Sequence, residues 1–202
     1  MRVGLFGGSF DPIHRGHVLA ASAARREAGL ERVLFLPTAQ PPHTPGRAFA
    51  PALARYAMVE IALLGDPNLA VSAHELTLGR PAYTVETLES FRAAEPNWEI
   101  ALLLGADSLF ELITWRRWRD LLESTPLVVL ARPGYRREEH LEPLAPEIER
   151  AIADGRVTFV DNPPHPASST EIRRRLAAGT EIPADWLDPA VLRYLEKYAL
   201  YR

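Results

Sequence analysis

Residues 2–17 read RVGLFGGSFDPIHRGH and have the pattern of a strand, a turn and the start of a helix. Residues 2–7 form an apolar run typical of a buried strand, and residues 13–28 place apolar side chains at helical spacing. Gly7 and Gly8 open the turn between them, and Gly29 is suited to end the helix in the left-handed conformation. A strand, a glycine turn and a helix in this order predict the opening unit of a parallel α/β sheet.

The same alternation continues along the whole chain. Further apolar runs predict strands at residues 32–37, 69–73, 99–104, 127–131 and 156–160, and helical spacing predicts helices near 53–64, 84–94, 144–152, 171–178 and 189–199. Because the strand runs are apolar throughout, we expect them to be buried on both faces. The predicted fold class is α/β: a Rossmann-like, open, mainly parallel sheet with helices on both faces. We expect a single domain over residues 1–202, with a C-terminal helical portion from about residue 168.

Two proline-rich stretches, residues 38–51 and 161–166, interrupt this pattern and are predicted to be loops. Each follows a predicted strand. Since open α/β sheets bind ligands beyond the carboxyl ends of their strands, we expect both loops to border the functional site.

Composition excludes several classes of protein. The 202 residues are 47% hydrophobic and 24% charged, which is enough for a folded core, and the net charge of −3 gives no basic field for nucleic acid. Cysteine is absent, so disulfides, thiol nucleophiles and cysteine-based metal sites are excluded. No apolar run approaches the roughly 20 residues of a membrane span, and residues 1–10 do not resemble a secretory signal. We therefore expect a cytoplasmic protein with no membrane or nucleic-acid partner.

The glycine turn also carries candidate chemistry. Backbone N–H groups at Gly7, Gly8 and the helix start favour an anion, and His14 and His17 lie three residues apart in the first helical turn. Two imidazoles at a helix N-terminus suit a polyphosphate. The stretch lacks the Gly-Lys-Ser/Thr of a Walker loop and the G-x-G-x-x-G dinucleotide fingerprint. The alternative is a tight turn with two incidental surface histidines.

A second motif, SSTEIR at residues 168–173, predicts another helix start. Ser168 and Glu171 have the spacing of a capping box, so the motif could simply begin a helix. The alternative is that Ser169, Thr170 and Arg173 grip the same polyphosphate from a second helix N-terminus.

GGSFDPIHRGH and SSTEIR together resemble the bacterial nicotinate-nucleotide adenylyltransferases of NAD biosynthesis, which belong to the H-x-G-H nucleotidyltransferase superfamily. Further parts of the resemblance follow in order along nearly the whole chain: PPH at 41–43, YTVET at 83–87, GAD at 105–107, Trp115 and ARPG at 131–134. The chain departs from the family where it has Thr44 in place of the usual lysine after PPH, and Glu86 in place of aspartate. The first departure bears on how this loop holds the mononucleotide, with Arg47 as a candidate replacement.

The resemblance implies roles for particular residues. His14, His17 and Arg173 would be catalytic. The ATP site would comprise Gly7, Gly8, Ser9, Phe10, His14, His17, Gly105, Asp107, Ser169, Thr170 and Arg173, with Asp107 on the ribose. The mononucleotide site would comprise Ser9, His43, Thr84, Trp115 and Arg132, with Trp115 stacked on the pyridine ring.

Several of these residues have plainer explanations. Asp107 and Thr84 could each be a helix N-cap, and Trp118, like Trp115, could be a packing group, which we prefer for Trp118. His43 and His74 are expected to be solvated, and His140 and His165 to lie on the surface.

The implied reaction is adenylyl transfer from ATP to nicotinate mononucleotide, giving nicotinate adenine dinucleotide and pyrophosphate. Mg²⁺ would travel with ATP without a dedicated protein site. A synthetase-type enzyme is disfavoured because Lys197 is the only lysine. An enzyme that prefers nicotinamide mononucleotide and a non-catalytic nucleotide-binding regulator remain as alternatives, and a homo-oligomer stays open.

Overall fold

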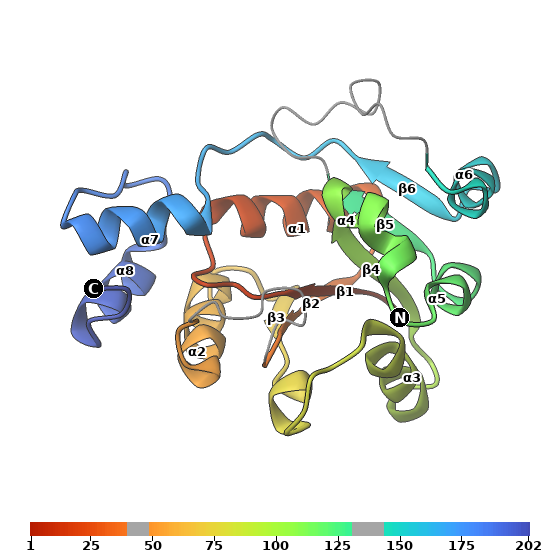
Figure 1. The fold of residues 1–202 in the computed structure, drawn as a ribbon, viewed down its shortest axis with the longest axis horizontal. Helices are drawn as coiled ribbons and strands as arrows, with labels where there is room; N and C mark the ends of the chain where they lie inside the picture. Colours follow the sequence, from red (N-terminus) through yellow and green to blue (C-terminus); the bar gives the residue numbers. More distant parts are fainter. Residues whose placement is uncertain (40–48, 131–143) are drawn as a thin grey trace. The chain divides into compact units, whose positions relative to one another are not determined.

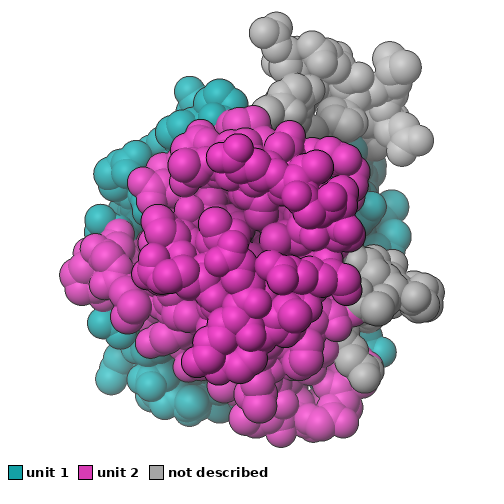
Figure 2. Space-filling view, turned by 90° about the vertical axis from the view of Figure 1, so that its left-hand side faces the viewer, with its two compact units in different colours: residues 1–6, 20–33, 83–164 teal, residues 7–19, 34–82, 165–202 magenta. Residues whose placement is uncertain are grey.

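The computed structural model describes residues 1–39, 49–130 and 144–202. The chain folds into two compact units (Figure 2). Unit 1 comprises residues 1–6, 20–33 and 83–164, and unit 2 comprises residues 7–19, 34–82 and 165–202. The expectation of one domain over residues 1–202 stays a prediction.

Parallel strands form the centre of unit 1. Strand β1 (Arg2–Gly8) pairs in parallel with β4 (Glu99–Gly105), β4 with β5 (Leu127–Leu130), and β5 with β6 (Val157–Val160). Consecutive residues of a strand point to opposite faces, and residues 100–104 and 127–130 are all buried. Both faces of β4 and β5 are therefore covered, as the uniformly apolar runs predict. Edge strand β6 exposes its two central residues.

One helix of unit 1 precedes β4 in the chain, and the other helical segments lie between β4 and β6 (Figure 1). They are α3 (Thr84–Ala94), α4 (Ala106–Glu111), the 3₁₀ turn η2 (Leu112–Thr114), α5 (Trp118–Ser124) and α6 (Pro146–Ala153). Helix α4 contacts β4 and β5, α6 contacts β6, and α5 contacts α3 and α6. Because α4 follows β4 directly, the polar residues of its first turn lie just beyond the carboxyl end of a buried strand.

Strand β1, helix α1 (Arg15–Glu27) and strand β2 (Arg32–Pro37) are divided between the two units, and unit 2 holds the other elements. These are α2 (Ala52–Leu63), β3 (Leu69–Val71), the 3₁₀ turn η1 (His74–Thr77), α7 (Ser169–Ala178) and α8 (Pro189–Lys197). Helix α2 contacts β3 and α8. The core of this unit is apolar and fully buried at Phe35, Met58, Val59, Val191 and Leu195.

The strand order is β3-β2-β1-β4-β5-β6, which confirms the predicted α/β class with an open sheet. The order reverses between β1 and β4, and doubly wound folds bind ligands beyond the carboxyl ends of the strands at such a reversal. No helix in the described part of the chain is long and apolar enough to cross a membrane.

Most elements agree with their predicted ranges, and α3 and β2 agree at both ends. The loop at 161–166 is confirmed, whereas residues 40–48 of the other predicted loop lie outside the described residues. Gly29 and Gly179 follow their helices with φ of 63° and 65°, as expected of left-handed caps. Helices α4 and α5 were not predicted, because six or seven residues are too few for helical spacing to show.

Candidate active site

The H-x-G-H turn sits at the start of α1 and holds its two imidazoles together. His14 is the cap residue, because its carbonyl oxygen accepts from the N–H groups of His17 (3.0 Å) and Val18 (3.4 Å). The Nδ1 atom of His17 in turn accepts from the N–H of His14 at 3.2 Å, and the two rings stack with centroids 3.7 Å apart. An accepting Nδ1 carries no proton, so the neutral His17 ring carries its proton on Nε2.

The glycines of the motif make room for neighbouring rings. A Cβ at Gly8 would lie 3.0 Å from the ring of Phe10, and a Cβ at Gly16 would lie 3.1 Å from the ring of His14. Phe10 is buried, has a φ of 44°, and meets the ring of His17 edge-on with centroids 5.2 Å apart. Among the described residues, apart from its chain neighbours, none has an atom within 4 Å of the position of a Cβ on Gly7. The buried ring of Phe10 therefore packs against the ring of His17. Any contact of Phe10 with a ligand would come from its backbone.

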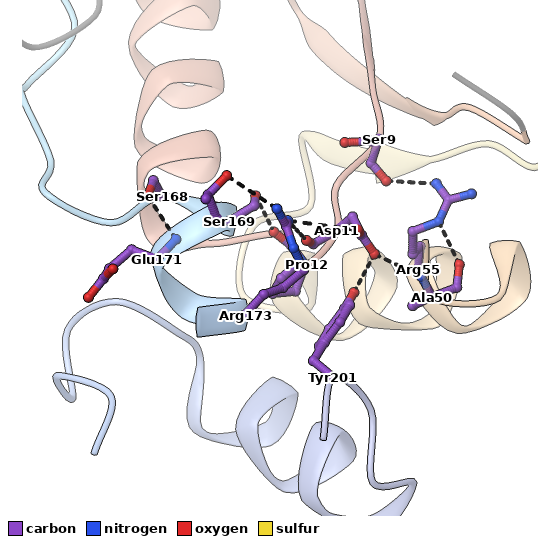
Figure 3. Close-up of polar contacts among 11 residues, drawn as sticks. Ser9, Asp11, Pro12, Ala50, Arg55, Ser168, Ser169, Glu171, Arg173 and Tyr201 are labelled. Carbon is purple, nitrogen blue, oxygen red and sulfur yellow. Dashed lines mark hydrogen bonds and ion pairs between the residues drawn. The ribbon is translucent and has the colours of Figure 1, made fainter. Parts of the chain in front are cut away.

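Within unit 2, the second motif is hydrogen-bonded directly to the first (Figure 3). Ser169 Oγ donates to the carbonyl of Pro12 at 2.9 Å. Arg173, whose side chain is 19% exposed, donates from Nη1 to the carbonyl of Asp11 at 2.5 Å and from Nη2 to Thr170 Oγ1 at 3.2 Å. Three predicted residues of the second motif (Ser169, Thr170 and Arg173) thus form one cluster with Asp11 and Pro12, in the loop that leads into α1.

The capping box predicted at Ser168 is only half present. Ser168 Oγ accepts from the N–H of Glu171 at 3.2 Å, as expected. The Glu171 carboxylate does not return this bond. It accepts from Arg174 at 2.6 Å and Arg175 at 2.8 Å, and hydrogen bonds from these two arginines lower the pKa of Glu171 to about 2. Arg174 and Arg175 are therefore held by Glu171, whereas Arg173 is held by the first motif.

A fully buried carboxylate, Asp11, links the turn to two other parts of unit 2. Its Oδ1 accepts from the N–H of Ala50 at 3.0 Å and from the hydroxyl of Tyr201 at 2.6 Å. Arg173 Nη1 lies 3.7 Å from Oδ2. Burial, together with the hydrogen bond to Asp11, raises the pKa of the Tyr201 hydroxyl above its usual value, so Tyr201 remains a donor at neutral pH.

A buried cation, Arg55 of α2, balances Asp11 and is 1% exposed. Its guanidinium donates to four backbone carbonyls of the described residues: Ala50 at 3.0 Å, Ser9 at 2.7 Å, Thr38 at 2.7 Å and Ala39 at 3.2 Å. Burial lowers the pKa of Arg55, and the charge of Asp11 opposes this shift. Arg55 therefore fixes the backbone after β1 to the two residues that follow β2 and to Ala50, two residues before α2.

Sequence reasoning missed Arg55 and Tyr201. An arginine within the otherwise apolar part of α2 is a signal that could have identified Arg55. Tyr201, the penultimate residue, carries no comparable signal in the sequence.

The remaining described candidates lie in unit 1. Gly105 is the cap residue of α4 and Asp107 its second residue, whereas Thr84 is the first residue of α3 after the cap Tyr83. The alternative that Asp107 or Thr84 is an N-cap is therefore wrong. Trp115 is half-buried where η2 ends. Trp118 begins α5 and has the guanidinium carbon of Arg119 4.3 Å from its ring centroid, and its packing role stays a prediction.

Five predicted residues need separate comment. His43, Arg132 and His140 lie outside the described residues, as does Arg47. The assignment of His165 to the surface is wrong. Its side chain is 11% exposed, its Nδ1 accepts from the N–H of Ala167 at 3.2 Å, and its Cβ lies 3.5 Å from the position of a Cβ on Gly16. The neighbouring prolines suggested a solvated loop, but this loop packs against the first turn of α1 within unit 2.

The described residues were also searched for side chains that could together hold a metal ion. Over residues 1–39, 49–130 and 144–202, no group of three or more His, Asp and Glu side chains is placed to hold a metal ion.

Fold and site together define a doubly wound α/β protein with an H-x-G-H turn at the start of α1, and comparison with known proteins adds its family. Residues 5–175 match the cytidylyltransferase-like family. A Thermus thermophilus protein named "probable nicotinate-nucleotide adenylyltransferase" is 46% identical over 202 residues, covering 100% of both chains. A Symbiobacterium thermophilum protein of the same name is 39% identical, covering 99% of this chain and 95% of its own.

A solved structure gives the same fold. Nicotinic acid mononucleotide adenylyltransferase from Plasmodium falciparum, complexed with NaAD, superimposes with a TM-score of 0.77 at 17% sequence identity, covering 99% of this chain and 97% of that one. The chain therefore belongs to the cytidylyltransferase-like family and, within it, to the nicotinate-nucleotide adenylyltransferases.

Proposed function

We propose that the chain transfers the adenylyl group of ATP to nicotinate mononucleotide, giving nicotinate adenine dinucleotide and pyrophosphate, in NAD biosynthesis. The observation that carries the proposal is the cluster in which α7 is hydrogen-bonded to the loop that leads into α1. Ser169 bonds to Pro12, and Arg173 bonds to Asp11. Two helix N-termini and a guanidinium would then bind one anionic ligand, and a triphosphate has enough negative charge to accept from all three.

The reaction needs little from the protein beyond positioning and charge. A phosphate oxygen of nicotinate mononucleotide attacks the α-phosphorus of ATP, and the bond from that phosphorus to the oxygen bridging to the β-phosphorus breaks. The attacking oxygen is already anionic at neutral pH, so no general base is required. Charge grows on the departing pyrophosphate, where His17 Nε2–H, Arg173 and the backbone N–H groups would stabilise it.

Ser169 has a narrower role than its place in the motif suggests. Its hydroxyl proton goes to the Pro12 carbonyl, so that hydroxyl offers lone pairs rather than a proton. We therefore assign the phosphate contact of Ser169 to its backbone N–H. In the same proposal, Asp107 binds the ribose, Thr84 and Trp115 bind the mononucleotide, and Mg²⁺ enters as part of the ATP complex.

A labelling experiment tests this function. The protein is incubated with magnesium, nicotinate mononucleotide and ATP labelled with ³²P at the α-phosphorus. All the label is expected in the dinucleotide, with none bound to denatured protein, because the acceptor attacks phosphorus directly. Label on the protein would contradict the direct displacement, and label remaining in ATP would contradict the transfer itself.

Replacing Trp115 with alanine is expected to raise the KM for the mononucleotide about tenfold or more and to leave the KM for ATP nearly unchanged, because a stacked ring touches one substrate only. Steady-state kinetics with each substrate varied in turn measures both constants. Trp118→Ala is the matched control, since Trp118 pairs with Arg119, and neither KM should change in that variant. Equal rises in both constants for Trp115→Ala would assign Trp115 to packing.

A further inference from the structure

A third histidine, His165, packs against the H-x-G-H turn within unit 2. Its side chain is 11% exposed, and its Cβ lies 3.5 Å from the position that a Cβ on Gly16 would take. The ring of His14 lies 3.1 Å from the same position. The missing side chain of Gly16 therefore leaves room for two histidines, one from the turn itself and one from a distant part of the chain.

The imidazole of His165 also holds the backbone that leads into α7. Its Nδ1 accepts from the N–H of Ala167 at 3.2 Å. Because an accepting nitrogen carries no proton, the neutral ring carries its proton on Nε2, which lies 3.9 Å from Asp185 Oδ2. Ala167 is itself buried, and a buried N–H that loses its acceptor costs free energy. An apolar side chain in place of the imidazole would therefore force this segment to rearrange.

The held segment directly precedes the start of α7. Ser168 is the cap residue, and Ser169 and Thr170 are the first two residues of the helix. Their N–H groups have no carbonyl within the helix to donate to, and such groups bind phosphate oxygens well. The hydroxyl of Ser169 gives this turn one anchor, and the bond from Ala167 to His165 gives it a second.

We propose that His165 is a positioning residue for ATP binding: by packing against Gly16 and accepting from the N–H of Ala167, its imidazole holds the first N–H groups of α7 where they meet the triphosphate. This inference rests on the proposed function, in which those N–H groups bind phosphate oxygens. His165 itself contacts no substrate. Its effect therefore depends on Nδ1 as an acceptor.

Two substitutions separate the acceptor from the bulk of the ring. His165→Leu fills much of the volume without an acceptor, whereas the side-chain oxygen of His165→Asn reaches about as far as Nδ1 and can accept from the N–H of Ala167. Isothermal titration calorimetry measures the affinity of each variant for ATP with magnesium. His165→Leu is expected to weaken ATP binding about tenfold, and His165→Asn to keep most of the affinity.

Asp185→Ala is the matched control, because it removes the carboxylate that faces Nε2 and leaves the bond at Nδ1 in place. Asp185 is exposed, so the variant should fold normally and bind ATP as the unchanged chain does. A loss in Asp185→Ala as large as the loss in His165→Leu would assign the effect to the carboxylate and overturn the inference.

Hydrogen exchange of the chain without nucleotide, followed by NMR, is the second measurement. The amide of Ala167 is expected to exchange faster in His165→Leu than in His165→Asn, while the amides of α8 keep their rates. Faster exchange throughout α8 as well would show that His165 acts through the general stability of unit 2, and this would overturn the inference.

Two results of the titration would also overturn it. Unchanged ATP affinity in His165→Leu would show that the acceptor is not needed, and equal losses in the leucine and asparagine variants would show that Nδ1 is not the atom that matters. Failure of the unchanged chain to bind ATP or to form dinucleotide would instead contradict the proposed function. The exchange rates would then still show whether His165 holds Ala167.

Discussion

Replacing His17 with asparagine is expected to lower kcat by about 10²-fold, whereas glutamine at this position retains part of the activity. The asparagine amide reaches about as far as Nδ1, so it can still accept from the N–H of His14 and preserve the start of α1. It has no atom at the position of Nε2, which is the nitrogen that carries the proton. Glutamine reaches about as far as Nε2 and can place an N–H there.

Steady-state kinetics with saturating ATP and nicotinate mononucleotide measures the difference. His74→Asn is the matched control, because His74 begins η1 and is not among the residues proposed to bind the phosphates of ATP. Its kcat should stay near that of the unchanged protein. Near-normal kcat in His17→Asn would contradict the assignment of His17 as the donor to the departing pyrophosphate.

Replacing Arg55 with methionine is expected to lower the free energy of unfolding by about 3–5 kcal/mol, the scale for removing one partner of a buried charge pair. Methionine fills a similar volume, so the loss comes from polarity rather than from a cavity. The variant leaves the carbonyls of Ser9, Thr38 and Ala50 without their donor and leaves Asp11 with less compensating charge. Chemical denaturation followed by far-UV circular dichroism measures the change.

Arg193→Met is the control for this prediction. Arg193 is an exposed residue of α8, and its replacement should change the free energy of unfolding by no more than about 0.5 kcal/mol. Similar losses in the two variants would show that the carbonyl cluster around Arg55 does not stabilise unit 2.

Local sequence patterns predicted individual strands, helices and helix ends, because these depend on residues that are close together in the chain. Strand β2 is a continuous apolar run, and helix α3 has apolar residues at regular turns, so both were predicted with their ends. Gly29 and Gly179 ended their helices as predicted, because a left-handed residue is recognisable from its type. Helices α4 and α5 were missed because they are only one or two turns long, too short for apolar residues to recur at helical spacing.

The candidate site divides in the same way. The sequence predicted the two helix starts and the residues His14, His17 and Arg173, since motif spacing carries that information. It did not predict that Arg55 bonds to Ser9 across 46 positions, or that Tyr201 bonds to Asp11 across 190. Such contacts depend on how distant segments of the chain fold together, and the local spacing of apolar residues does not indicate them. For the same reason His165 was misplaced, because its proline-rich neighbours predict solvent while its packing partner, Gly16, lies far away in the sequence.

The most direct test of the account compares two acceptors. Purified protein, ATP and magnesium are incubated with nicotinate mononucleotide or, separately, with nicotinamide mononucleotide, and the dinucleotide product is quantified by chromatography. The account predicts rapid formation of nicotinate adenine dinucleotide with an equal amount of pyrophosphate, and less product from the amide. Absence of dinucleotide from both acceptors, with folded protein, would contradict the proposed adenylyl transfer.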